Sequence, residues 1–184
     1  MNLKDLHIDT TWTLFLDRDG VINKKLDNDY VKHTTEFEFI DGTLSALRML
    51  SPLFQTIVVV TNQQCIGKQI IFPEDLELIH QNMMYEITYL KGRIDKIYYS
   101  PYLAAENHPT RKPAIGMALQ AKKDFPNIDF NKSIIVGDSM SDMEFGRNAG
   151  MKTVYLSAEP KEDPLIDFNF KSLIYFAHTL TTKH

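Results

Sequence analysis

The chain has 184 residues, of which 43% are hydrophobic and 24% are charged, and its formal net charge at pH 7 is −4. This composition is typical of a soluble globular protein with a sizeable core, and we expect a single domain over residues 1–184. The negative net charge argues against a broad electrostatic interaction with nucleic acid or with anionic lipid.

The single cysteine, Cys65, excludes an intramolecular disulfide and a zinc cluster built of thiolates. We expect its thiol to be buried and inert rather than reactive. No apolar stretch is long enough to span a bilayer, and the N-terminus lacks the apolar core of a signal peptide. We therefore expect a cytoplasmic protein with no nucleic-acid or membrane partner, and nothing in the sequence requires more than a monomer.

Hydrophobic periodicity predicts strands that alternate with helices along the chain. In chain order, the expected elements are a strand over 12–16, a helix over 43–50, a strand over 56–61, a helix over 73–90, a strand over 94–99, a helix over 114–125, a strand over 133–136, a helix over 142–149, a strand over 153–156 and a helix over 171–180. Pro73 suits a first helical residue, and Gly150 is typical of a helix end.

This alternation predicts a three-layer α/β domain, in which a doubly wound, mostly parallel sheet carries helices on both faces. The runs "TIVVVT" and "SIIVGD" are continuously apolar, as expected for strands covered on both sides. Ligands of such sheets bind beyond the carboxyl ends of the strands. Candidate functional residues should therefore follow directly after strands.

Two aspartates follow the first strand, in the stretch "TLFLDRDGVIN". Asp17 is a plausible nucleophile towards phosphorus, and Asp19 could give a proton to the leaving group and later take one from water. Two like charges this close suit a site in which a metal ion or a phosphate lies between them. The alternative is an ordinary Asp-Gly turn.

Three further segments bring polar groups to the same edge of the sheet. Asp138, after the fourth strand, could hold a Mg²⁺ ion together with Asp17. Thr61 and the backbone N–H of Asn62, after the second strand, could bind phosphate oxygens. Lys112, in the loop after the third strand, would add a positive charge near the nucleophile.

Other polar residues near these motifs have structural explanations of comparable weight. Asp142 could support the metal site or cap its helix, and both uses stay open. Arg18 should point to the side opposite the two aspartates. The histidines are scattered, and His33, His80 and His178 are expected at the surface.

The four segments "FLDRDGVIN", "VVVTNQ", "RKP" and "IIVGDSMSD" together resemble the ordered motifs of the haloacid-dehalogenase (HAD) superfamily of phosphohydrolases. Their spacing leaves little room for a large cap domain. The sequence is most similar to the capless branch that holds the heptose-bisphosphate phosphatases and the histidinol-phosphatase domain, over roughly residues 12–156.

This resemblance implies a Rossmann-like HAD core and a role for each motif residue. It implies Asp17 as the nucleophile, Asp19 as the acid and base, and Mg²⁺ held by Asp17, Asp19 and Asp138. It also implies substrate contacts at Asn23, Thr61, Asn62, Gln63, Arg111 and Lys112.

The chain departs from the family pattern at two places. Many relatives carry a zinc-binding Cys/His loop before the Arg-Lys-Pro motif, but here Ser100 and Thr110 stand where cysteines would be expected. His108 alone cannot close a tetrahedral site, so we expect no structural zinc. Ser139 stands where several relatives place a lysine or arginine, which leaves recognition of a second substrate phosphate open.

The sequence thus predicts a Mg²⁺-dependent phosphomonoesterase that acts on a small phosphorylated metabolite, a sugar phosphate of the heptose-bisphosphate kind, through an aspartyl-phosphate. A histidinol-phosphate phosphatase and a nucleic-acid 3′-end phosphatase are the enzymatic alternatives, and the net charge disfavours the second. The non-enzymatic alternative is a receiver-like module phosphorylated on an aspartate. Such a module has no use for an acid/base at Asp19.

Overall fold

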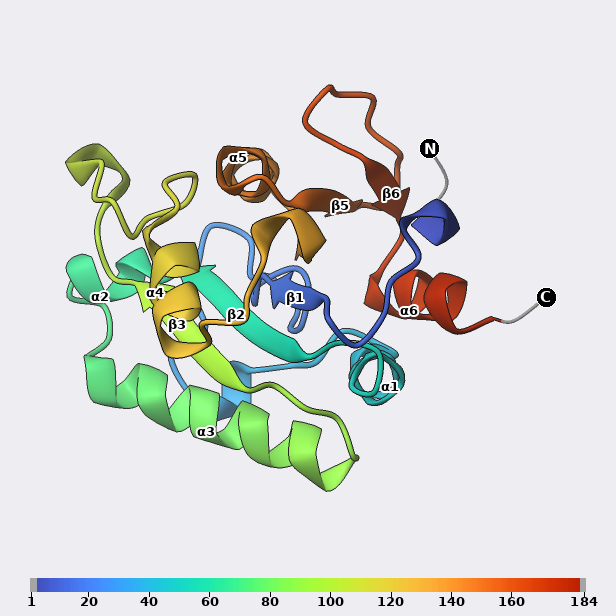
Figure 1. The fold of residues 1–184 in the computed structure, drawn as a ribbon. Helices are drawn as coiled ribbons and strands as arrows, with labels where there is room; N and C mark the ends of the chain where they lie inside the picture. Colours follow the sequence, from blue (N-terminus) through green and yellow to red (C-terminus); the bar gives the residue numbers. More distant parts are fainter. Residues whose placement is uncertain (1–2, 183–184) are drawn as a thin grey trace.

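Six parallel strands form the sheet at the centre of the structure, a computed structural model that describes residues 3–182 (Figure 1). The strands are β1 (Thr13–Leu16), β2 (Thr56–Asn62), β3 (Lys96–Ser100), β4 (Ser133–Gly137), β5 (Lys152–Leu156) and β6 (Phe168–Phe170). Their order in the sheet is β3-β2-β1-β4-β5-β6, and each neighbouring pair is parallel.

The strand order reverses between β1 and β4. From β1 the chain builds outward through β2 to β3, then returns to place β4 on the other side of β1 and continues to β5 and β6. Parallel strands need crossover connections, which the helices supply. A ligand site in a doubly wound sheet is expected beyond the carboxyl ends of the strands at this reversal.

Helices cover both faces of the sheet (Figure 1). The helices are α1 (Thr43–Leu50), α2 (Gln64–Gly67), α3 (Pro73–Tyr89), α4 (Gly116–Asp124), α5 (Met140–Ala149) and α6 (Leu173–Thr181). Four short 3₁₀ helices, Leu3–Leu6, Thr34–Glu36, Ala104–Glu106 and Phe130–Lys132, complete the regular structure. The three-layer architecture expected from the sequence is confirmed.

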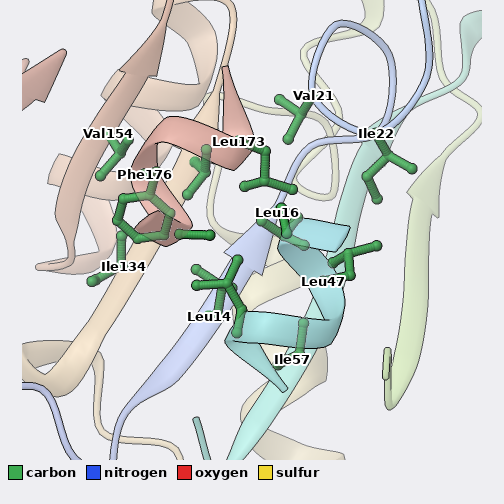
Figure 2. Packing of buried hydrophobic residues seen from close by; sticks show 14 of the residues in the cluster. Leu14, Leu16, Val21, Ile22, Leu47, Ile57, Ile134, Val154, Leu173 and Phe176 are labelled. Carbon is green, nitrogen blue, oxygen red and sulfur yellow. The ribbon is translucent and has the colours of Figure 1, made fainter. Parts of the chain in front are cut away.

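Alternation along β1 divides the core between the two faces. Leu14 and Leu16 lie on one face in a cluster with Leu47 of α1 and Phe176 of α6, as Figure 2 shows. Phe15 lies on the other face, where its ring meets Phe145 of α5 at a centroid distance of 6.4 Å. Because successive side chains of a strand point to opposite faces, burial on both sides explains the continuous apolar runs.

The predicted helices and the five predicted strands are present, with ends that differ by one or two residues. The strand expected over 94–99 starts later, at Lys96, and the helix expected over 142–149 starts earlier, at Met140. No sequence pattern predicts α2, β6 or the 3₁₀ helices. These elements have three or four residues each, too few to show a hydrophobic period.

The residues predicted to bound helices do so. Pro73 opens α3, and Gly150 ends α5 with φ of 85° in the left-handed region. Within residues 3–182, no helix combines the length and the apolar character needed to cross a membrane.

Candidate active site

The predicted functional segments meet at the carboxyl end of the sheet, around the reversal between β1 and β4. A cavity of about 250 Å³ opens there. Its lining includes Asp17 and Asp19 from the end of β1, Thr61 from the end of β2, and Lys112 from the loop before α4. The placement of polar groups after strands therefore brings together side chains that lie far apart in the sequence.

Asp17 lies at the floor of this site. Its backbone N–H continues the sheet by donating to the carbonyl of Val136, 2.9 Å away. Its carboxylate oxygen Oδ1 lies 2.9 Å from Nζ of Lys112 and accepts the backbone N–H of Arg18 at 2.8 Å. Burial and repulsion from Asp142 raise the pKa of Asp17. A nearby cation is therefore required to keep this carboxylate ionised.

Lys112 is a buried cation with three oxygen partners. Its Nζ donates to the carbonyl of Val60 at 2.7 Å and forms ion pairs with Asp17 at 2.9 Å and with Asp142 at 2.5 Å. Burial alone would lower its pKa, but the carboxylates of Asp142 and Asp17 outweigh that effect and raise it. The amide of Asn62 fixes the loop, because it both donates to and accepts from the Lys112 backbone.

Of the two uses that the sequence left open for Asp142, the structure shows the helix cap, and support of a metal site stays a prediction. Its Oδ2 accepts the backbone N–H of Ser139 at 3.1 Å, which caps α5, and its Oδ1 pairs with Lys112. Asp142 also belongs to an acidic cluster with Asp17 and Asp138, in which one ligand atom of each residue lies within 4.8 Å of the others.

This cluster fits a divalent cation such as Mg²⁺, which prefers carboxylate oxygens and water. Oδ1 of Asp138 is buried and has no hydrogen-bond partner, so an acceptor there is left for a ligand. Burial also raises the pKa of Asp138. Both carboxylate oxygens of Asp142 already have partners, Lys112 for Oδ1 and the Ser139 backbone N–H for Oδ2, so the carboxylates of Asp17 and Asp138 are the pair best suited to hold the ion.

Gly20 leaves room for the Asp138 carboxylate beside the turn that follows Asp19. Its φ is +87°, and a Cβ at this position would lie 2.2 Å from Oδ2 of Asp138. Only glycine therefore permits both the turn after Asp19 and the approach of Asp138.

Asp19 is held by four hydrogen bonds from three side chains. Arg18 Nη2 donates to both of its carboxylate oxygens at 2.9 and 3.0 Å, Asn23 Nδ2 donates at 2.9 Å, and Gln63 Nε2 donates at 2.7 Å. Burial raises the pKa of Asp19, but the Arg18 charge and these donors outweigh it and lower the pKa. The surroundings of Asp19 thus favour its ionised form.

Two expectations about neighbouring residues were wrong. Arg18 does not point away from the aspartates: its side chain is 1% exposed, and its guanidinium turns back onto Asp19. His80 is not at the surface but buried in α3, where its Nε2 lies 3.1 Å from Nη1 of Arg18.

The residues predicted to contact substrate fall into two groups. Thr61, Asn62 and Arg111 line the cavity. Asn23 and Gln63 are buried, and the structure gives their amides a different partner, the Asp19 carboxylate. A substrate contact for either amide stays a prediction.

Lys25, which was not among the predicted site residues, also lines the cavity. Its Nζ lies 3.1 Å from Oδ2 of Asp138, so a lysine from the loop after β1 places a cation beside the fourth motif. Asp138 is followed in the sequence by Ser139, at the position where several relatives carry a lysine or arginine. No local pattern marks Lys25, because the contact spans more than a hundred residues of sequence.

Hydroxyl groups and a histidine form a short chain of hydrogen bonds in the loop before the Arg-Lys-Pro motif. Ser100 Oγ lies 3.2 Å from Thr110 Oγ1, which lies 2.8 Å from Nδ1 of His108. The His108 ring also stacks on Tyr102. Elsewhere, Cys65 is fully buried, and burial raises the pKa of its thiol, as expected for an inert cysteine.

Comparison with known proteins places this geometry in a family. A family model described as polynucleotide kinase 3 phosphatase matches residues 13–177. A D-glycero-alpha-D-manno-heptose-1,7-bisphosphate 7-phosphatase of Campylobacter jejuni is 38% identical over 163 residues, which cover 89% of this chain and 92% of the relative. The chain belongs to the HAD superfamily of phosphatases. It is an enzyme, and the resemblance noted in its motifs is confirmed.

A further relative of this phosphatase carries a similar name, and a solved structure shares its fold. A D-glycero-beta-D-manno-heptose-1,7-bisphosphate 7-phosphatase of Escherichia coli K12 is 35% identical over 161 residues, or 80% of each chain. The crystal structure of D,D-heptose 1.7-bisphosphate phosphatase from B. bronchiseptica, complexed with magnesium and phosphate, matches with a TM-score of 0.83. It is 25% identical and covers 92% of this chain and 97% of that chain.

Proposed function

We propose that this phosphatase is Mg²⁺-dependent and removes one phosphate from a small sugar bisphosphate of the heptose-1,7-bisphosphate kind, through an aspartyl-phosphate on Asp17. The observation that carries the proposal is the contact between Asp17 and Lys112 on the floor of the cavity, with the unpartnered Oδ1 of Asp138 nearby. A buried carboxylate beside a fixed cation and a metal-binding acceptor is arranged for attack on phosphorus.

The side chains of Asp17 and Asp138, with the backbone carbonyl of Asp19, would hold the metal ion. Bound there, Mg²⁺ would neutralise phosphate charge and orient the phosphoryl group for in-line displacement.

The first half of the reaction transfers the phosphoryl group to the protein. A carboxylate oxygen of Asp17 forms the new bond to phosphorus while the bond between phosphorus and the sugar oxygen breaks. Asp19 must be protonated for this step, and it gives that proton to the departing oxygen. Lys112 and Thr61, which line the cavity, would stabilise the charge on the phosphoryl oxygens.

The second half restores the enzyme. Water attacks the phosphorus of the aspartyl-phosphate, Asp19 takes a proton from that water, and the bond between Asp17 and phosphorus breaks. Inorganic phosphate leaves, and both aspartates return to their starting states.

The substrate class rests on the relatives and on two cationic side chains at the cavity. The two curated relatives described above carry the name heptose-1,7-bisphosphate 7-phosphatase, one for the alpha and one for the beta anomer. Arg111 and Lys25 both line the cavity, and Lys25 is more than half exposed. They would give a second phosphate two cations, which supports a bisphosphate.

The test is phosphate release from a panel of substrates with Mg²⁺ and with EDTA. The panel contains both anomers of heptose 1,7-bisphosphate, fructose 1,6-bisphosphate, histidinol phosphate and a 3′-phosphorylated oligonucleotide. We expect turnover to be fastest on a heptose bisphosphate, to stop with EDTA, and to be lost in Asp17→Asn. Asp41→Asn makes the same chemical change at an exposed position and should retain activity.

Other results would redirect the proposal. Fastest turnover of the oligonucleotide or of histidinol phosphate would replace the sugar bisphosphate with that substrate. Equal background rates for the wild type and Asp17→Asn on every substrate would contradict the whole scheme. A phospho-aspartate that lasts minutes and whose lifetime Asp19→Ala leaves unchanged would favour a receiver-like module instead.

A further inference from the structure

A chain of three side chains connects helix α3 to the active site. His80 in α3 contacts Arg18, and Arg18 contacts Asp19. Arg18 is 1% exposed and His80 is 5% exposed, so both contacts lie within the protein. His80 does not line the cavity and comes from an element that contributes no residue to the motifs.

The chemistry of the contact fixes the state of the imidazole. An arginine guanidinium donates hydrogen bonds and accepts none, so Nε2 of His80 must accept, and its proton must lie on Nδ1. Burial and the Arg18 charge also lower the pKa of His80, to about 3. His80 is therefore a neutral acceptor at neutral pH.

His80 determines where the guanidinium of Arg18 lies. Nη2 of Arg18 is committed to the two oxygens of Asp19, and Nε is buried without a hydrogen-bond partner. The acceptor that the structure offers to Nη1 is Nε2 of His80. The ring of Tyr99 in β3 packs edge-on against the imidazole, with centroids 6.3 Å apart, and restrains it.

We propose that His80 is a positioning residue for the second half of the reaction: it fixes Arg18 on the Asp19 carboxylate, which is thereby kept in place to take a proton from the attacking water. This inference rests on the proposed function, since it requires an aspartyl-phosphate that water hydrolyses. It assigns a role to a residue outside the four motifs.

The two halves of the reaction can be separated with p-nitrophenyl phosphate. Its leaving group departs without a proton, so transfer of phosphate to Asp17 does not need Asp19 as an acid. Hydrolysis of the aspartyl-phosphate still needs Asp19 as a base. A misplaced Asp19 therefore slows hydrolysis of the aspartyl-phosphate and does not change the rate of phosphate transfer to Asp17.

His80→Leu removes the acceptor and puts an apolar side chain at this position of α3. We expect kcat on p-nitrophenyl phosphate to fall by about 10-fold or more, with kcat/KM within about 2-fold of the wild type. A burst of nitrophenolate should precede the steady state, and mass spectrometry of acid-quenched protein should show phosphorylated chain. His80→Gln, which restores an acceptor, should recover most of kcat and lose the burst.

Gln81→Leu is the matched control, because it makes a similar change at the next residue of α3, which is exposed. It should leave kcat, kcat/KM and the absence of a burst unchanged. Equal losses of kcat and kcat/KM in His80→Leu without a burst would show a merely structural role and overturn the inference. Unchanged kinetics in His80→Leu would overturn it as well.

If His80→Leu does not fold, Arg18→Lys tests the same connection from its other end. Lysine keeps the charge but cannot bind both Asp19 oxygens and His80 at once, so the same fall in kcat and the same burst are expected. Equal losses of kcat and kcat/KM would again overturn the inference. A wild type that is inactive on this ester and on the whole substrate panel would contradict the proposed function itself.

Discussion

Nζ of Lys112 lies 2.9 Å from Oδ1 of Asp17, and both side chains are almost completely buried. The same Nζ also pairs with Asp142, so one cation neutralises two carboxylates that would otherwise repel each other. Burial makes this arrangement strongly dependent on the lysine, because removal of one partner leaves an uncompensated charge in a poorly solvated site.

We expect Lys112→Met to lower kcat/KM on the best substrate by about 100-fold or more, since the charge that stabilises the transferring phosphoryl group is lost. Without Mg²⁺, the free energy of unfolding should fall by about 3–5 kcal/mol. Steady-state kinetics and urea denaturation measure the two effects. Lys96→Met, which removes a lysine paired at the surface with Asp124, should change stability by less than about 1 kcal/mol. Comparable effects of both variants would contradict the prediction.

Gly20→Ala should weaken metal binding beyond its effect on the backbone. Gly20 and Gly42 both have positive φ, of +87° and +84°, so alanine costs about 1–2 kcal/mol of backbone strain at either position. Only at Gly20 would the new Cβ lie 2.2 Å from a carboxylate oxygen of Asp138. We expect the Mg²⁺ concentration for half-maximal activity to rise in Gly20→Ala and to stay unchanged in Gly42→Ala. Equal Mg²⁺ requirements in both variants would show that Asp138 does not depend on the glycine.

The general plan of the site follows from the sequence because it depends on local patterns. Continuous apolar runs mark the strands, and the polar residues directly after them must lie at one edge of a parallel sheet. Asp17 and Thr61 reach the cavity for that reason, and Lys112 reaches it from the loop between β3 and α4. Mutual distances, such as the contact of Lys112 with Asp142, depend on loop conformation and could not be predicted.

The contacts around Asp19 could not be predicted from the sequence. Arg18 was expected on the side opposite the aspartates, where it would lie if the strand continued, but β1 ends at Leu16. His80 lies one residue after Ile79 and three before Met83, within the apolar stripe of α3. That position was a signal of burial, but its partner lies 62 residues away and no periodicity identifies it.

In many relatives the loop before the Arg-Lys-Pro motif binds zinc, and here we expect hydrogen bonds of hydroxyl groups to stabilise it instead. We expect elemental analysis to find no stoichiometric zinc and a zinc chelator to leave the melting temperature unchanged. Thr110→Val removes hydrogen bonds to both Ser100 and His108 and should lower the free energy of unfolding by about 1–3 kcal/mol. Ser100→Ala removes only one of these bonds and should cost less. A drop in melting temperature with the chelator would contradict the prediction.

His80 should make the stability of the protein sensitive to mildly acidic pH. Burial and the nearby Arg18 charge lower its pKa from 6.5 to about 3, although Asp19 opposes the shift. Between these values the unfolded chain binds the proton and the folded chain does not, so His80 lowers stability as pH falls and has no effect above 6.5. His80 can change the free energy of unfolding by at most about 1.4 kcal/mol per pH unit.

Urea denaturation of the wild type and His80→Gln at pH 7, 6, 5 and 4 isolates this contribution, because the carboxylates titrate in both proteins. Glutamine can accept the hydrogen bond of Arg18 but does not titrate, so the stability of the variant should fall less steeply between pH 6.5 and 4. Above pH 7 the free energies of unfolding of the two proteins should change with pH at the same rate, because the imidazole is neutral in both the folded and the unfolded state. Parallel curves across the whole range would mean that His80 is protonated in the folded protein, and Nε2 could not then accept from Arg18.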